Sequence, residues 1–113
     1  FGFVPDCGSI CAMLENACGR KPVFIGKPDP TMIRLAWEQT GYGPAETLMV
    51  GDRLYTDIAC GVHAGVDTAL VLTGEATAAD AAVSDTPPTV IYENMAQLLA
   101  ALRQADHEKG ATA

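Results

Sequence analysis

The sequence predicts an open α/β fold, a parallel sheet with helices on both faces. Short apolar runs of strand length alternate with segments of helical periodicity. Each apolar run is continuous rather than alternating, which is typical of strands buried on both faces of a parallel sheet. The composition, 49% hydrophobic and 19% charged over 113 residues, is that of one small globular domain.

Four strands are predicted from the apolar runs, at residues 23–25, 47–50, 69–72 and 89–92. Five helices are predicted from apolar residues three or four apart. They span residues 8–18, residues 30 or 31 to 40, residues 56–64, residues 77–82, and a segment around 95–102. Gly19 is placed to end the first helix, and Gly41 and Gly43 to end the second. Thr56 or Asp57 is placed to cap the third. The polar residues 104–113 predict a disordered tail.

Net charge narrows the classes of partner. The formal charge is −7 with only seven lysines and arginines, which disfavours nucleic acid because phosphate backbones require clustered cations. It equally disfavours an anionic membrane surface, and the apolar runs are far shorter than the roughly 20 residues that span a bilayer. We therefore expect no nucleic-acid and no membrane partner.

The four cysteines lie at positions 7, 11, 18 and 60. No pair has the C-x-x-C spacing of zinc or thioredoxin-like sites, and the first three are expected to share a helix face as small buried side chains. Reduced thiols fit a cytoplasmic location. The chain opens without an initiator methionine or a signal peptide, so we expect it to begin inside a longer protein.

Polar residues follow three of the predicted strands, and the third of these, at 69–72, ends at Thr73-Gly74. Lys27 follows the first strand and Asp52 the second, and open parallel sheets bind ligands at such strand ends. Asp57 lies in the first turn of the next helix and can reach back toward Asp52. Two carboxylates suit Mg²⁺, which prefers few protein oxygens together with water and phosphate, and Lys27 adds a charge for phosphate. Taken singly, such residues are more often helix caps or solvated side chains.

The order and spacing of these residues indicate a family. Gly-Lys-Pro-Asp-Pro at 26–30, Val-Gly-Asp-Arg-Leu-Tyr-Thr-Asp-Ile at 50–58 and Gly-Val-His-Ala-Gly at 61–65 resemble the third and fourth motifs of the haloacid dehalogenase (HAD) superfamily. The Gly-Lys-Pro-x-Pro and Gly-Asp-x-Leu-x-Thr-Asp-Ile forms are most similar to its NagD-like branch, which includes nitrophenylphosphatases and sugar-phosphate phosphatases. The resemblance covers roughly residues 3–102.

The resemblance implies a Mg²⁺-dependent phosphatase acting on a small phosphate ester. By this resemblance Lys27 contacts the phosphoryl group, Asp52 ligates Mg²⁺, and Asp57 supports the metal site. Pro5, Cys7 and Gly8 resemble the end of the cap domain, near the substrate's leaving group. Residues 1–20 are then the return from the cap to the core, and residues 21–103 are the carboxy-terminal half of the core.

The sequence departs from the family in one respect. The family's first strand ends in Asp-x-Asp-Gly, whose first Asp forms an aspartyl-phosphate and whose second acts as general acid and base; no Asp-x-Asp occurs in these 113 residues. We therefore expect the parent protein to be the enzyme and this chain to be inactive alone. In the family the nucleophile strand lies beside the strand that matches residues 47–50. Without that neighbour an open edge would favour self-association.

Two alternatives remain. A non-catalytic α/β binding module that keeps the HAD-like fold would explain the absent nucleophile. A receiver domain of the response-regulator type would share the parallel sheet and the strand-end Asp, but it requires an early acidic pair, and the only acids before the first predicted strand are Asp6 and Glu15.

Overall fold

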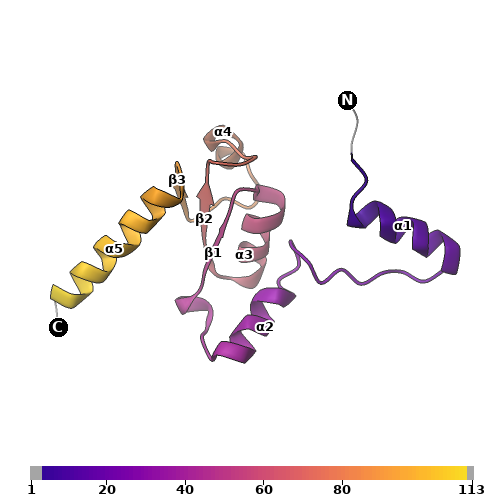
Figure 1. Cartoon of the computed structure of the whole chain (residues 1–113), viewed down its shortest axis with the longest axis horizontal. Helices are drawn as coiled ribbons and strands as arrows, with labels where there is room; N and C mark the ends of the chain where they lie inside the picture. Colours follow the sequence, from indigo (N-terminus) through magenta and orange to yellow (C-terminus); the bar gives the residue numbers. More distant parts are fainter. Residues whose placement is uncertain (1–3, 112–113) are drawn as a thin grey trace.

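The structure is a computed structural model and describes residues 4–111. Five α-helices and three strands occur in this part of the chain (Figure 1). Their order is α1 (Cys7–Cys18), α2 (Thr31–Thr40), β1 (Leu48–Gly51), α3 (Ala59–Ala64), β2 (Asp67–Val71), α4 (Ala78–Ala82), β3 (Val90–Tyr92) and α5 (Met95–Ala111). A 3₁₀ turn, Pro44–Glu46, precedes β1, and a π-helical turn, Leu54–Ile58, precedes α3.

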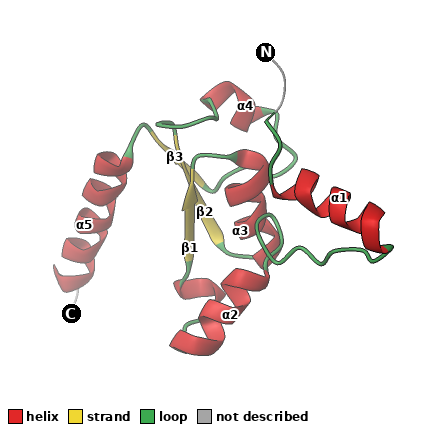
Figure 2. Cartoon of the chain, turned by 45° about the vertical axis from the view of Figure 1, so that its right-hand side comes forward, coloured by secondary structure: helices red, strands yellow, loops and turns green. Residues whose placement is uncertain are grey.

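The three strands form one parallel sheet in the order β1-β2-β3. Gly51 pairs with Leu70, and Leu70 pairs with Ile91, so the carboxyl ends of the strands lie at one edge of the sheet. The helices α2 and α3 lie on one side of the sheet, and α5 lies on the other (Figure 2). The predicted fold class, a parallel sheet with helices on both faces, is confirmed.

The core gathers where α3 and the preceding turn pack against β1 and β2. One cluster joins Ile33 of α2 to Cys60 and Val66, and a second joins Ile58, Leu70 and Ala81. Ile58 and Leu70 are fully buried, and burial of side chains this size is worth about 1.5–3 kcal/mol each. This packing fixes the strand ends relative to the turn that carries Asp57.

The close approach of α3 to the sheet depends on Gly61. A β-carbon at this position would lie 2.8 Å from the β-carbon of Met49 and closer still to the Thr68 methyl group. A larger side chain would therefore push the helix away from β1 and β2.

No helix in residues 4–111 is long and apolar enough to cross a membrane.

The helix α1 forms as predicted but buries none of its residues. The Asp6 side chain accepts a hydrogen bond from the Gly8 amide at its start, and Gly19 ends it with φ of 70°. An extended segment then leads from α1 to α2, so that α1 lies well away from the sheet in Figure 1. Three of its cysteines were expected to be buried; instead Cys7 and Cys18 are exposed and Cys11 is partly exposed.

Three predicted elements differ from the structure. The strand at 23–25 does not form: these residues pair with no described strand, and Val23 is 87% exposed. Apolar β-branched and aromatic residues favour a strand only where a neighbouring strand is available to hydrogen-bond with it. The helix predicted at 56–64 begins earlier, in the turn at Leu54–Ile58, because the Ile58 amide already bonds to the Arg53 carbonyl.

The third difference concerns the tail predicted to be disordered at 104–113. The helix α5 continues through it to Ala111, and the Gln104 side chain donates a hydrogen bond to Glu108 one turn later, at 3.1 Å. Pairs four residues apart on a helix surface support it locally. Residues 112–113, like residues 1–3 at the other end, lie outside the described part of the chain.

Candidate active site

Three of the predicted site residues, Lys27, Asp52 and Asp57, lie in the loop before α2 and after the carboxyl end of β1. Asp52 follows directly after β1, and Asp57 lies in the turn Leu54–Ile58 that leads into α3. Lys27 lies in the loop that turns the extended segment into α2, and the peptide bond between Lys27 and Pro28 is cis. Lys27 and Asp57, which are far apart in sequence, thus meet near the carboxyl ends of the strands.

Asp57 is the buried carboxylate of the site, only 5% exposed. One of its oxygens, Oδ1, accepts a hydrogen bond from the Lys27 ammonium and forms an ion pair with it. The other, Oδ2, accepts from the Arg53 amide at 3.3 Å. A buried carboxylate is retained where it is paired and hydrogen-bonded, as both oxygens are here.

Gly51 makes room for Asp57. A β-carbon at this position would lie 2.6 Å from Oδ2 of Asp57 and closer still to its Cβ and Cγ. The absence of a side chain at the last residue of β1 therefore allows the carboxylate to fold back against the strand end. The glycine that precedes Asp52 in the motif therefore leaves space for the Asp57 side chain.

Asp52 is partly exposed and is held by the loop that follows β2. Its Oδ2 accepts a hydrogen bond from the Glu75 amide at 3.2 Å, and its carbonyl accepts from the Ala76 amide at 3.1 Å. A β-carbon at Gly74 would lie 2.6 Å from the Cβ of Asp52 and closer to its carboxylate. Sequence reasoning marked Thr73-Gly74 as a strand end but gave Gly74 and Glu75 no role, because no local pattern links them to Asp52.

The Glu75 side chain contacts two residues that follow Asp52 in the chain. It forms an ion pair with Arg53 at 2.8 Å and accepts from the Tyr55 hydroxyl at 3.0 and 3.2 Å. The hydrogen bond to Glu75 raises the pKa of Tyr55, with smaller contributions from desolvation and the negative charge of Glu75.

The loop that carries Lys27 is tied to α2 and α3. Asp29 accepts from the Thr31 amide at 2.8 Å, and hydrogen bonds from Thr31 lower the pKa of Asp29. The buried Cys60 thiol donates to the Asp29 carbonyl at 3.3 Å, and burial raises the pKa of that thiol. The His63 ring bonds to the Pro28 carbonyl at 3.1 Å. These contacts fix the backbone on either side of Lys27.

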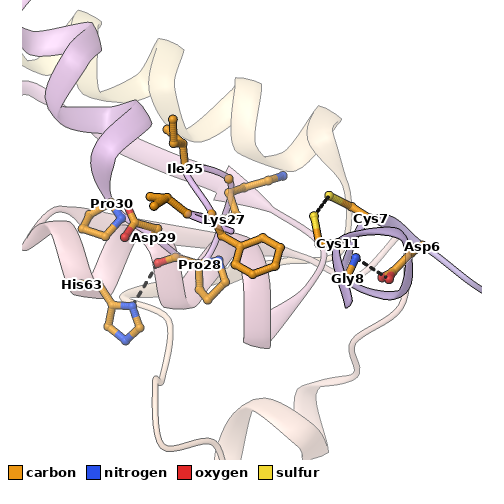
Figure 3. Close-up of a pocket in the computed structure, with 13 residues that line it drawn as sticks. Asp6, Cys7, Gly8, Cys11, Ile25, Lys27, Pro28, Asp29, Pro30 and His63 are labelled. Carbon is orange, nitrogen blue, oxygen red and sulfur yellow. Dashed lines mark hydrogen bonds between the residues drawn. The ribbon is translucent and has the colours of Figure 1, made fainter. Parts of the chain in front are cut away.

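A cleft of about 830 Å³ separates α1 from the Lys27 loop. Figure 3 shows Cys7, Gly8 and Cys11 on one side of it and the Lys27 loop with His63 on the other. Two of the residues predicted to face the leaving group, Cys7 and Gly8, thus share a cleft with Lys27. Pro5, the third, is exposed and does not line it.

The two carboxylates fit a magnesium site in part. Asp52 has one oxygen, Oδ1, that accepts no hydrogen bond from the described residues, whereas both oxygens of Asp57 are engaged. Within residues 4–111, no three His, Cys, Asp or Glu side chains converge as a metal-binding group. Magnesium usually takes one or two protein carboxylates and completes its shell with water and phosphate, so the two carboxylates have the oxygen chemistry that such a site requires.

Comparison with known proteins identifies the family. A family profile described as HAD-hydrolase-like matches residues 24–98. The ribonucleotide monophosphatase NagD of Escherichia coli K12 is 42% identical over 97 residues, which are 86% of this chain and 39% of that protein. The chain therefore belongs to the HAD-like hydrolases, as the motifs predicted.

Solved structures agree on fold and branch. The 4-nitrophenylphosphatase of Thermotoga maritima matches with a TM-score of 0.75 and 44% identity, over 84% of this chain and 37% of that one. A glycerol phosphate phosphatase of Mycobacterium tuberculosis, solved in complex with magnesium, matches with a TM-score of 0.73 and 37% identity, over 86% and 30% of the two chains. Within the superfamily the chain lies in the NagD-like, nitrophenylphosphatase branch, and it spans less than half the length of these relatives.

Proposed function

We propose that the full-length protein containing this chain hydrolyses a small phosphomonoester, such as a sugar phosphate, with Mg²⁺. The ion pair between Lys27 and Asp57 carries the proposal. The two residues are 30 positions apart and belong to two different family motifs, and the ion pair joins them at the end of the sheet where Asp52 lies. The named relatives, a ribonucleotide monophosphatase and a 4-nitrophenylphosphatase among them, act on phosphate esters. One relative was solved with magnesium, which supports the choice of metal.

The proposed roles follow from charge and position. Lys27, whose side chain is half exposed, offers a positive charge to the phosphoryl group while its ion pair with buried Asp57 holds it at the edge of the sheet. Asp52 and Asp57 would hold the magnesium ion, Asp52 directly. A magnesium ion held there would supply positive charge to offset the negative charge of the phosphoryl oxygens. Cys7 and Gly8 would face the leaving group across the cleft, with Pro5 further out.

The nucleophile of the proposed aspartyl-phosphate mechanism is outside this sequence, which contains no Asp-x-Asp. We therefore propose that residues 1–20 end a cap domain, that residues 21–103 form the second half of the core, and that the chain is inactive alone. The free cysteines accord with a cytoplasmic protein. The edge of β1, unpaired among the described strands, makes self-association of the isolated chain a further proposal, which light scattering would test.

The test is hydrolysis of nitrophenyl phosphate by the full-length protein with and without Mg²⁺. We expect Asp52→Asn and Lys27→Ala each to lower kcat/KM by at least about 10²-fold. The first removes a charged ligand of the proposed magnesium ion, and the second removes the positive charge offered to the phosphoryl group. Glu38→Gln, on the exposed face of α2, is the matched control and should retain activity. Full activity of Asp52→Asn would refute the proposal, and an inactive wild-type protein that still binds phosphate esters would favour the non-catalytic module.

A further inference from the structure

The loop after β2 passes beside Asp52 at the carboxyl ends of the strands. Two consecutive amides of this loop, those of Glu75 and Ala76, donate to Asp52, one to the carboxylate at 3.2 Å and one to the carbonyl at 3.1 Å. A residue bound through both its side chain and its backbone has little freedom to rotate. Residues 73–76 therefore decide how the Asp52 carboxylate is oriented.

Gly74 permits this approach. Any β-carbon there would collide with the Asp52 side chain, at 2.6 Å from its Cβ and nearer to the carboxylate. The loop would then have to withdraw, and the Glu75 amide would lose its hydrogen bond to Oδ2. The neighbouring backbone and the Asp52 side chain thus fit only when position 74 is glycine.

The Glu75 side chain ties the loop after β2 to the segment that follows Asp52. Its carboxylate binds Arg53 and Tyr55, which belong to the segment directly after Asp52. The Arg53 and Glu75 side chains are 52% and 50% exposed, so this contact adds little to global stability. Its consequence is local, because it ties the two loops that flank Asp52 to each other.

We propose that Gly74 and Glu75 are positioning residues for Asp52, holding Oδ2 so that Oδ1 is presented to a divalent cation. The inference rests on the proposed function in that it takes Asp52 as the metal ligand. Groups that hydrogen-bond a ligating carboxylate orient it, and their loss commonly lowers metal affinity about 10–100-fold. Neither residue touches substrate or metal in this role.

The first test needs no metal and no activity. Amide hydrogen exchange is measured at residues 74–76 of the metal-free full-length protein for wild type, Glu75→Ala, Glu75→Gln and the exposed control Glu38→Gln. We expect Glu75→Ala to speed exchange about threefold to tenfold, with Glu75→Gln intermediate because its amide oxygen still accepts from Tyr55. Exchange equal to that of the control in both variants would overturn the role of Glu75.

The second test measures Mg²⁺ affinity by titration calorimetry. Gly74→Ala should raise the Kd for Mg²⁺ at least about tenfold and Glu75→Ala by less, while saturating Mg²⁺ restores most of kcat. Gly43→Ala is the matched glycine control, since a β-carbon there meets nothing within 4 Å. Unchanged Mg²⁺ affinity in a folded Glu75→Ala protein with faster exchange would overturn the positioning role alone. Full magnesium-dependent activity of Asp52→Asn would instead refute the proposed function and this role with it.

Discussion

The sheet region at 48–71 and the amino-terminal region at 7–25 both carry regularly spaced apolar residues, but only the first buries them. Leu70 is fully buried, whereas Leu14 is 55% exposed and Val23 87% exposed. The helix α1 has its Asp6 cap and its Gly19 stop although it buries none of its residues, yet the extended segment after it stays unpaired among the described residues. The difference teaches that the hydrogen bonds of a helix lie within its own segment, while burial and strand pairing require a partner.

The largest expected contrast is between two leucines. Leu70→Ala should lower the free energy of unfolding by about 2–5 kcal/mol, because it empties a fully buried position in β2. Leu14→Ala on exposed α1 should change it by less than about 0.5 kcal/mol. Urea denaturation measures both. Equal losses would break the comparison by showing that α1 is packed in solution.

A pair of glycines, Gly61 in α3 and Gly43 in the loop after α2, tests how closely α3 packs on the sheet. Gly61→Ala should cost about 1–3 kcal/mol, since its β-carbon would overlap Met49 and Thr68 across the helix–sheet contact. Gly43→Ala, which enters open space, should be within about 0.5 kcal/mol of wild type. Thermal unfolding of the two variants measures the difference. A neutral Gly61→Ala would mean that α3 does not sit this close to β1 and β2.

Limited proteolysis compares the two regions directly. Trypsin should cleave after Arg20 at least about tenfold faster than after Arg34, because Arg20 lies in extended, exposed backbone and Arg34 lies within α2. Mass spectrometry of the early fragments identifies the first cut. Cleavage at Arg34 first would place the less stable region in α2 instead.

The smallest expected effect is the pH dependence of the Asp29 contact. Hydrogen bonds from Thr31 lower the pKa of Asp29 below its ordinary value of 3.8, so the ionised form is favoured in the folded state. The stabilisation is therefore present above pH 3.8 and is lost as pH falls through the lower folded-state value. Asp29→Asn should lower the melting temperature slightly at neutral pH, and the gap from wild type should close in acid. A gap that stays constant down to pH 2 would contradict this origin.

The sequence predicted most of the helices, but it did not indicate which of the proposed site residues would contact one another. Gly19 and Gly41 ended the first two helices as expected, because a left-handed glycine closes a helix whatever surrounds it. The strand at 23–25 was wrong, since its apolar residues resembled those of 47–50 and only the latter found a partner strand. The prediction placed Asp57 near Asp52, but nothing in the spacing indicated that Asp57 would bind Lys27.

By itself the sequence determined the family motifs, most of the helices, and the alternation of strands and helices after residue 30. These depend on hydrogen bonds and side-chain spacing within a few residues, which a linear pattern records. Only the tertiary structure decided that Lys27 pairs with Asp57 and that Gly74 and Glu75 hold Asp52. Those contacts join residues more than 20 positions apart, and they arise because parallel strands bring their carboxyl ends to one edge of the sheet.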